Sequence, residues 1–274
     1  MTILDEIAEK TRERIAKEKG LRPLENVRRE AEEAAAAAGN QKAGEEKTLP
    51  AFERALARKG MSFICEVKKA SPSRGVIARE FPYLQIAREY EAGGAAAISC
   101  LTEPFYFLGK DAYLKEIAAE VQIPVLRKDF TVDEYMIYQA RALGADAVLL
   151  ICSLLDDSRL KDWICLAGEL GMSGLVEAHN EREICRAADC GARIIGVNNR
   201  NLKDFTVDTE NSSRLRSLAP PSVLFVAESG IADPGQVRRL AADGVDAVLV
   251  GEALMRARDK KAALWRLSGG EEKV

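Results

Sequence analysis

The chain has 274 residues, of which 47% are hydrophobic and 30% are charged, and its formal net charge is −3. This composition is ordinary for a soluble globular protein, and the slight negative charge argues against a general nucleic-acid-binding surface. No run of about 18 apolar residues is present, and the charged N-terminus lacks the apolar core of a signal peptide, so we expect neither a membrane span nor secretion.

The first 48 residues predict a helical extension that packs on the main fold. Two helices are expected, over residues 1–17 and 21–38, followed by a polar linker over residues 39–47. The first helix carries an apolar stripe formed by Ile3, Leu4 and Ile7. Because such a stripe needs a partner, the extension is expected either to plug the bottom of the fold that follows or to border its functional mouth. The pattern does not choose between these alternatives.

After a short helix near Phe52 and Leu56, apolar strand-like segments alternate with helical ones in a repeat of about 25 residues. The eight predicted strands cover residues 62–67, 95–100, 123–127, 146–151, 172–176, 193–197, 222–227 and 246–250. The predicted helices cover residues 82–91, 110–120, 133–143, 156–170, 180–188, 209–218 and 234–242. Four of the strands follow a glycine, which suits the C-terminus of the preceding helix.

Repeated strand–helix units with almost continuously apolar strands are typical of a parallel sheet covered on both faces. We therefore predict an α/β fold, a (β/α)8 TIM barrel over residues 49–274, with the extension over residues 1–48 belonging to the same domain. A doubly wound open sheet is the structural alternative. No G-x-G-x-x-G motif follows the first strand, which excludes the dinucleotide-binding form of that alternative.

The six cysteines are expected to be reduced thiols, most of them buried. None forms a C-x-x-C pair, and four lie in or beside apolar runs. This usage is typical of a cytoplasmic protein. Since His179 is the single histidine, no zinc site is expected.

Charged and polar side chains follow the predicted strands, where a barrel of this type carries its reactive groups. On the first strand, Glu66 and Lys68 point to one face because side chains alternate, and Cys65 points to the other. Polar groups at the other strand ends are Thr102, Glu103, Arg127, Lys128, Asp129, Glu177, Asn198, Asn199, Arg200, Glu228, Ser229 and Glu252. Single members of this set, such as Glu103, Asp129 or Glu252, have an alternative interpretation as satisfied surface charges. Together they indicate an enzyme.

Two glycines after the seventh and eighth strands predict an anion site. Gly230 and Gly251 are each expected to open a helix, where backbone N–H groups bind anions. Barrels of this type often hold a phosphate in this position. Two ordinary tight turns are the alternative interpretation.

Seven strings in register carry a resemblance to one family. They are EVKKASPS at residues 66–73, LTE at 101–103, KDF at 128–130, LVEAH at 175–179, GVNNRNL at 196–202, ESGI at 228–231 and VGEALM at 250–255. In this set and this order, the chain resembles indole-3-glycerol phosphate synthase over about residues 1–270.

The resemblance implies a single-domain barrel of tryptophan biosynthesis. The implied reaction closes the ring of 1-(2-carboxyphenylamino)-1-deoxyribulose 5-phosphate and gives indole-3-glycerol phosphate, with loss of carbon dioxide and water. No cofactor and no metal are implied. The expected partner is the phosphorylated small-molecule substrate, with no nucleic acid and no membrane, and the expected state is a cytoplasmic monomer or weak homodimer.

Matched to the family, Lys128 is the expected general acid of ring closure, with Glu177 beside it to tune that proton or stabilise positive charge on the ring. Glu66 and Lys68 form an acid–base pair suited to dehydration. The sequence does not decide whether Lys68 or Glu177 donates the last proton. Ser229 and Asn198 complete the predicted catalytic set.

The predicted substrate-binding residues fall into three groups. Arg200, with Asn198, is expected to hold substrate hydroxyls or orient Glu177. The phosphate and its approach are expected to be lined by Ser71, Ser229, Gly230, Gly251 and the backbone N–H of Glu252, and Glu228 is a further expected substrate-binding residue. The aromatic ring is expected to be clamped by Phe107, Phe130 and Leu149, which as plain core residues would look the same. The loop over residues 71–77 carries Pro and Gly and is a candidate mobile lid.

Two other functions are alternatives for such a barrel. Another phosphate-sugar barrel enzyme, such as phosphoribosylanthranilate isomerase, would use a Cys/Asp pair, and no cysteine here stands at a strand end opposite an aspartate. A non-catalytic ligand-binding barrel would be expected to lose the acid–base residues, yet Glu66, Lys128 and Glu177 are all present.

Overall fold

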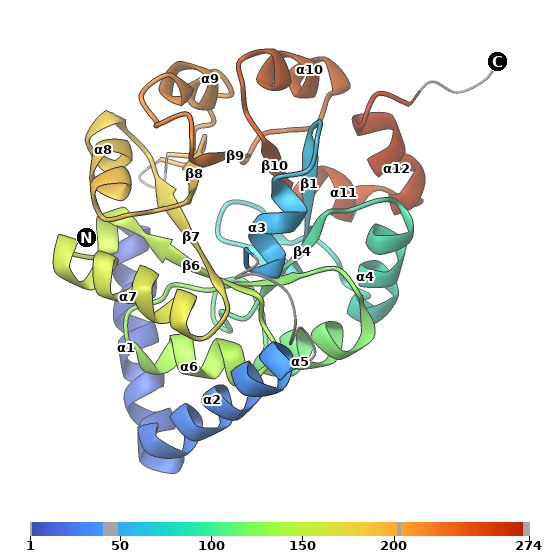
Figure 1. The fold of residues 1–274 in the computed structure, drawn as a ribbon. Helices are drawn as coiled ribbons and strands as arrows, with labels where there is room; N and C mark the ends of the chain where they lie inside the picture. The colour runs from blue at the N-terminus through green and yellow to red at the C-terminus, as the bar shows by residue number, and fades with distance from the viewer. Residues whose placement is uncertain (1, 41–48, 202–203, 271–274) are drawn as a thin grey trace.

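Eight parallel strands close into a barrel in the computed structural model, which describes residues 2–40, 49–201 and 204–270 (Figure 1). The strands are β1 (Ser62–Val67), β4 (Ala97–Leu101), β5 (Val125–Lys128), β6 (Ala147–Ile151), β7 (Ser173–Ala178), β8 (Ile194–Asn198), β9 (Leu224–Glu228) and β10 (Ala247–Val250). Closure comes from β1, which pairs with β4 on one side and with β10 on the other. The TIM-barrel prediction is confirmed, and every predicted strand is present within a few residues.

Helices surround the barrel in chain order. They are α1 (Ile3–Leu21), α2 (Leu24–Asn40), α3 (Ala51–Leu56), α4 (Tyr83–Ala92), α5 (Asp111–Glu120), α6 (Tyr135–Ala142), α7 (Asp157–Glu169), α8 (Glu181–Asp189), α9 (Asn211–Arg216), α10 (Pro234–Ala242), α11 (Glu252–Arg256) and α12 (Lys260–Leu267), with a short 3-10 helix, η1 (Cys152–Leu154), before α7. Gly94 and Gly144 follow α4 and α6 with φ of +92°, a conformation that glycine adopts without strain.

Side-chain alternation along the strands divides the core in two. One set of buried residues fills the barrel interior and includes Ile64, Leu126, Leu149, Leu175, Ile194, Val226 and Leu249. The other set, which includes Cys65, Val148 and Val176, packs outward against the helices. The interior therefore carries reactive groups only where the apolar layers end, at the C-terminal ends of the strands.

The N-terminal segments cover opposite ends of the barrel. Helix α3 lies across the near end in Figure 1, where Phe52 and Leu56 join the interior cluster and Glu53 pairs with Arg193. Helix α1 instead places its apolar stripe in the wall of the cavity at the other end. Of the two alternatives for the extension, the structure therefore places α1 at the mouth, while residues 51–56 close the bottom.

Helix boundaries differ from the predictions where local signals compete. Helix α1 runs to Leu21, beyond the predicted end at residue 17, and α2 starts only after Pro23, which cannot continue a helix. Helix α11 is the helix expected after Gly251, whereas α12 was not predicted. The predicted loop over residues 71–77 overlaps the hairpin of β2 (Ala70–Ser71) and β3 (Gly75–Val76). The predicted linker lies almost wholly outside the described residues.

Across the described ranges, each helix is too short or too polar to cross a bilayer.

Candidate active site

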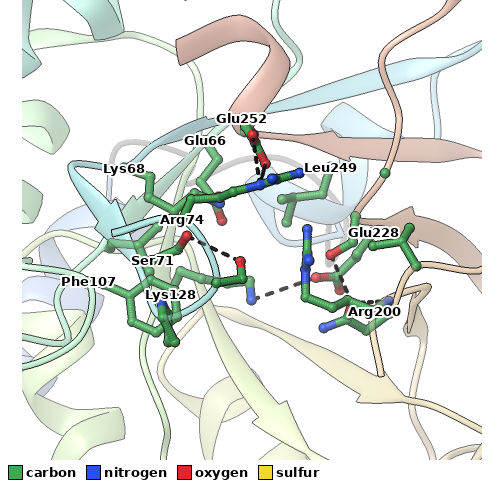
Figure 2. Close-up of a pocket in the computed structure, with 18 of the residues that line it drawn as sticks. Glu66, Lys68, Ser71, Arg74, Phe107, Lys128, Arg200, Glu228, Leu249 and Glu252 are labelled. Atoms are coloured by element: carbon green, nitrogen blue, oxygen red, sulfur yellow. Dashed lines mark hydrogen bonds and ion pairs between the residues drawn. The ribbon is translucent and has the colours of Figure 1, made fainter. Parts of the chain in front are cut away.

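The C-terminal ends of the strands surround a cavity of about 610 Å³ (Figure 2). Its size is within the range of small-molecule sites. All the residues predicted from the sequence as catalytic or substrate-binding line it: Glu66, Lys68, Ser71, Phe107, Lys128, Phe130, Leu149, Glu177, Asn198, Arg200, Glu228, Ser229, Gly230, Gly251 and Glu252. The barrel thus brings together side chains that lie up to 186 positions apart (252 − 66) in the sequence.

Glu66 and Lys68 form an ion pair on one face of the end of β1. Lys68 Nζ donates a hydrogen bond to Glu66 Oε1, and the Glu66 residue is only 4% exposed. Gly251 lies against this pair, and a Cβ at that position would collide with the Glu66 carboxylate and stand 3.0 Å from Lys68 Nζ. The missing side chain of Gly251 is therefore what lets β10 approach the pair.

Lys128 at the end of β5 stands between two buried carboxylates. Its Nζ is 3.5 Å from Glu177 Oε2 and 3.7 Å from Glu228 Oε2. Burial alone would lower the pKa of Lys128, but the negative charge around it outweighs burial and raises that pKa. Lys128 is therefore a charged ammonium at neutral pH.

The two carboxylates beside Lys128 differ in protonation. Burial would raise the pKa of Glu177, yet Lys128 and His179 lower it to about 2. Burial raises the pKa of Glu228 and, although Lys128 opposes this, repulsion from Glu177 helps to bring it to about 8. One carboxyl group is therefore ionised and the other carries a proton at neutral pH, the pattern that separates acid from base in many active sites.

The amide of Asn198 organises the end of β8. Its Oδ1 accepts hydrogen bonds from Ser229 Oγ at 2.9 Å and from the Arg200 backbone N–H at 3.0 Å. The next residue, Asn199, points the other way and binds the Ser229 carbonyl through Nδ2. Ser229 itself has φ of +69°, an uncommon conformation that these contacts hold in place.

Two aromatic rings form an apolar wall of the cavity. The centroids of Phe107 and Phe130 are 6.0 Å apart, and Leu149 lies in the barrel interior below them. Glu103 shapes the loop that carries Phe107, because its carboxylate accepts the backbone N–H groups of Phe105, Tyr106 and Phe107. Glu103 therefore has a structural role here.

A buried charge network fixes the strand end that carries Lys128. Asp129 Oδ2 lies 2.9 Å from Arg14 Nη2 on α1 and accepts the Thr102 hydroxyl at 2.6 Å. Arg127 Nε donates to the same threonine oxygen at 3.1 Å. Burial would raise the pKa of Asp129, but the two arginines hold it below its usual value. Asp129 therefore ties α1 to β5.

Three arginines, Arg74, Arg200 and Arg256, form a second part of the cavity wall, the arginine-rich wall. Arg74 on the β2–β3 hairpin lies 3.1 Å from Glu252, which also contacts Arg256 at 3.0 Å. Gly251 immediately precedes α11, as predicted, but the prediction that Gly230 opens a helix is wrong. Helix α10 covers the predicted residues 234–242, and the side chain of Asp233, three residues after Gly230, provides its N-cap.

Sequence reasoning did not assign several residues of the site. Arg74 lies in the segment predicted as a lid, and its charge beside two serines was an available signal. His179 lies two residues after Glu177, so strand alternation places it on the same side. The cavity contacts of Leu249 and Val207 carried no signal that distinguishes them from ordinary core or loop residues.

Known proteins match this chain over most of its length. The family model described as indole-3-glycerol phosphate synthase matches residues 4–267. A protein of that name from Lachnoclostridium phytofermentans is 51% identical over 268 residues, which are 97% of this chain and 98% of the relative. Another from Ruminiclostridium cellulolyticum is 56% identical over 219 residues, 80% of this chain and 84% of the relative.

Solved structures similar to this one bear on the fold alone, because their sequence identities are low. A thiamine phosphate pyrophosphorylase from Pyrococcus furiosus superposes with a TM-score of 0.58 at 19% identity, covering 80% of this chain and 96% of that one. A 3-hexulose-6-phosphate synthase from Salmonella typhimurium gives 0.60 at 16% identity, covering 76% and 97%.

Proposed function

The chain belongs to the indole-3-glycerol phosphate synthase family, and we propose that the residues of its barrel mouth close the indole ring of 1-(2-carboxyphenylamino)-1-deoxyribulose 5-phosphate. The enzyme is a carboxy-lyase of tryptophan biosynthesis that acts on a phosphorylated small molecule. Membership of this family argues against the isomerase alternative. The presence of the acid–base side chains Glu66, Lys128 and Glu177 argues against a non-catalytic barrel.

Lys128 donates the proton of ring closure. As the ring carbon that bears the carboxylate attacks the ketone carbon, the ketone oxygen gains negative charge and takes a proton from the ammonium. The ring then carries positive charge, which the ionised carboxylate of Glu177 stabilises. This carboxylate lies beside Lys128, with Oε2 3.5 Å from the lysine Nζ. Loss of carbon dioxide returns the electron pair to the ring and leaves a hydroxyl on the former ketone carbon.

Glu66 and Lys68 catalyse the dehydration step. The hydroxyl leaves as water with a proton from Lys68, while Glu66 takes a proton from the carbon next to the ring nitrogen, so that the double bond forms. Between the two candidates for the last acid, the structure favours Lys68. Glu177 is held ionised by Lys128 and His179, so it has no proton to give near neutral pH.

The remaining predicted residues hold the substrate. Phe107, Phe130 and Leu149 clamp the aromatic ring, as their shared wall supports. Glu228 is suited to a substrate hydroxyl, because its Oε1 has no hydrogen-bond partner within the described part of the chain. Asn198 and Arg200 complete this polar wall.

The phosphate is assigned to the arginine-rich wall. Backbone N–H groups near Gly230, Gly251 and Glu252 bind it together with the hydroxyls of Ser71 and Ser229. Arg74, which was not predicted, adds a positive charge from the hairpin. The hairpin is placed to act as a lid over this end of the cavity.

The protein is proposed to act in the cytoplasm as a monomer or weak homodimer, without nucleic-acid partners. All six cysteines are free thiols and four of them are buried, which fits a reducing compartment. Sedimentation at increasing protein concentration tests the oligomeric state, and a stable tetramer would contradict it.

The observation that carries the function is the Lys128 side chain between the buried carboxyl groups of Glu177 and Glu228, in the same cavity as the Glu66–Lys68 pair. The test is the appearance of indole fluorescence when the carboxyphenylamino substrate is added to the purified protein. Lys69→Met is the matched control for lysine variants, since Lys69 does not line the cavity. Absence of fluorescence with the folded wild-type protein would reject the function.

A further inference from the structure

His179 lies behind Glu177, between two carboxylates. Its Nε2 is 3.4 Å from Glu177 Oε1, and its Nδ1 is 3.2 Å from Glu183 Oε2. The imidazole is 19% exposed and does not line the cavity. It is the single histidine of the sequence.

Glu183 is fixed in place and cannot easily turn away from the imidazole. Its Oε2 accepts the His179 backbone N–H at 2.8 Å, and its Oε1 accepts Asn180 Nδ2 at 3.0 Å. Asn180 in turn caps α8 by accepting the Glu183 N–H. A carboxylate thus lies within 3.4 Å of each ring nitrogen, although Nε2 has no hydrogen-bond partner among the described residues and meets Glu177 as an ion pair. Two flanking negative charges favour the imidazolium, in which both ring nitrogens carry protons.

The charges that face His179 from the surrounding elements form one alternating row. Glu183 comes from α8 and Glu177 from β7, with Lys128 of β5 and Glu228 of β9 beyond Glu177. From α9, the group that reaches the His179 backbone is the neutral amide of Asn211. Glu177 therefore lies between two cations, Lys128 on one side and His179 on the other. Glu228 is paired with Lys128 alone among the described residues.

We propose that His179 is a positioning residue, an imidazolium that keeps Glu177 ionised and directed at Lys128, so that the proton shared by the two carboxyl groups resides on Glu228. The proposal rests on the proposed function for the roles of Glu177 and Lys128. Burial would lower the pKa of His179, but its two carboxylate neighbours raise it to about 10, in agreement with the geometry.

The imidazole can be observed directly without any substrate. Because the chain has one histidine, untagged protein labelled on histidine gives a single imidazole signal in NMR. We expect this signal to stay that of a doubly protonated ring from pH 5.5 to pH 8.5. A midpoint within about one unit of the ordinary value near 6.5 would overturn the proposal.

Two variants then test the effect on Glu177. His179→Gln removes the cation and keeps a polar amide, whereas Glu183→Gln keeps an acceptor and removes only the distant charge. For His179→Gln we expect the acidic limb of the kcat profile to move up by at least about one pH unit, which is a tenfold change in the equilibrium, with KM nearly unchanged. Glu183→Gln should move it less. An unmoved limb in folded His179→Gln would overturn the proposal.

The two readouts separate this proposal from the function on which it rests. If the wild-type protein forms no indole product, the NMR titration still decides whether His179 is an imidazolium. If His179→Gln does not fold, Glu183→Gln together with the wild-type titration decides the question. A normal titration midpoint in an active enzyme rejects the role of His179 alone.

Discussion

The carboxyl group of Glu228 lies 3.7 Å from the Lys128 ammonium, and its other oxygen, Oε1, has no hydrogen-bond partner among the described residues. A buried carboxyl group in this position is better protonated than charged, since Glu177 already supplies the negative charge that Lys128 requires. Because Glu228 must lose a proton at high pH while it stays buried, the free energy of unfolding should fall as pH rises.

Glu228→Gln should become progressively more stable than the wild type as pH rises. The folded-state pKa of Glu228 is raised to about 8, so its contribution to stability is fully present below the ordinary value near 4.5 and is lost as pH rises through about 8. Glutamine imitates the protonated form at every pH. We expect the difference in Tm to grow between pH 5 and pH 9, by about 2–4 °C for each kcal/mol. A constant difference would contradict a raised pKa.

Lys128→Met should abolish ring closure. General acid catalysis contributes about 10²–10⁴-fold, and the lost charge adds to this, so kcat should fall by at least roughly 10³. Substrate should still bind, because the aromatic wall and the arginine-rich wall are intact. The variant should also lose stability at neutral pH, since Glu177 is left buried without this cation. A variant that keeps more than about a tenth of the normal kcat would reject Lys128 as the principal acid.

Lys68→Met should block a later step than Lys128→Met does. Rapid-quench analysis of Lys68→Met should find an intermediate that has lost carbon dioxide but still carries the hydroxyl, because Glu66 keeps no acid partner. Lys128→Met should accumulate no such species. Lys69→Met, the adjacent lysine change, should behave like the wild type. The same intermediate in both active-site variants would refute the division of labour between the two lysines.

Gly251→Val should damage both chemistry and phosphate binding. A Cβ at this position would collide with the Glu66 carboxylate, so the Glu66–Lys68 pair must move, and the larger side chain also fills the predicted phosphate approach. We expect KM to rise and kcat to fall together, with circular dichroism unchanged. Gly168→Ala is the control, because its Cβ would meet nothing within 4 Å and alanine favours helix α7. An unchanged KM would count against the phosphate assignment.

Two isoleucines of α1 allow the mouth to be tested separately from the packing. Ile7 and Ile15 are each 2% exposed, but only Ile7 lines the cavity. Each change to Ala should cost about 2–5 kcal/mol of unfolding free energy. Only Ile7→Ala should raise KM in addition. Equal KM values for the two variants would mean that α1 contributes stability alone.

The sequence predicted the barrel and the cavity wall because both follow from local patterns. Strand alternation placed Glu66 and Lys68 together and Cys65 opposite, and parallel strands bring their C-terminal ends to one rim. The start of α10 was predicted correctly because Asp233 and Pro234 make a strong helix start, but Gly230, four residues before Pro234, does not itself open the helix. The placement of α1 could not be predicted, since an apolar stripe does not say which end of a barrel it meets.

The protonation states of the site were also beyond the sequence. Glu177 and Glu228 both stand near the C-terminal ends of their strands, and the sequence pattern does not distinguish their environments. We infer that the cation of His179 separates them, since it lies 3.4 Å from Glu177 and its backbone N–H is bound by Glu183 of α8. Such differences depend on distances of a few ångströms between segments that are far apart in the chain.

The contact of Arg14 with Asp129 joins residues 115 positions apart and sets an order of assembly during synthesis. Helix α1 leaves the ribosome before β5, and Asp129, directly after β5, follows Arg14 only after roughly 6–23 s at translation rates of about 5–20 residues per second. Until then the face that carries Ile7 has no barrel to cover. The mouth is therefore completed late, and a nascent chain stalled before β5 would leave the apolar stripe of α1 exposed to water.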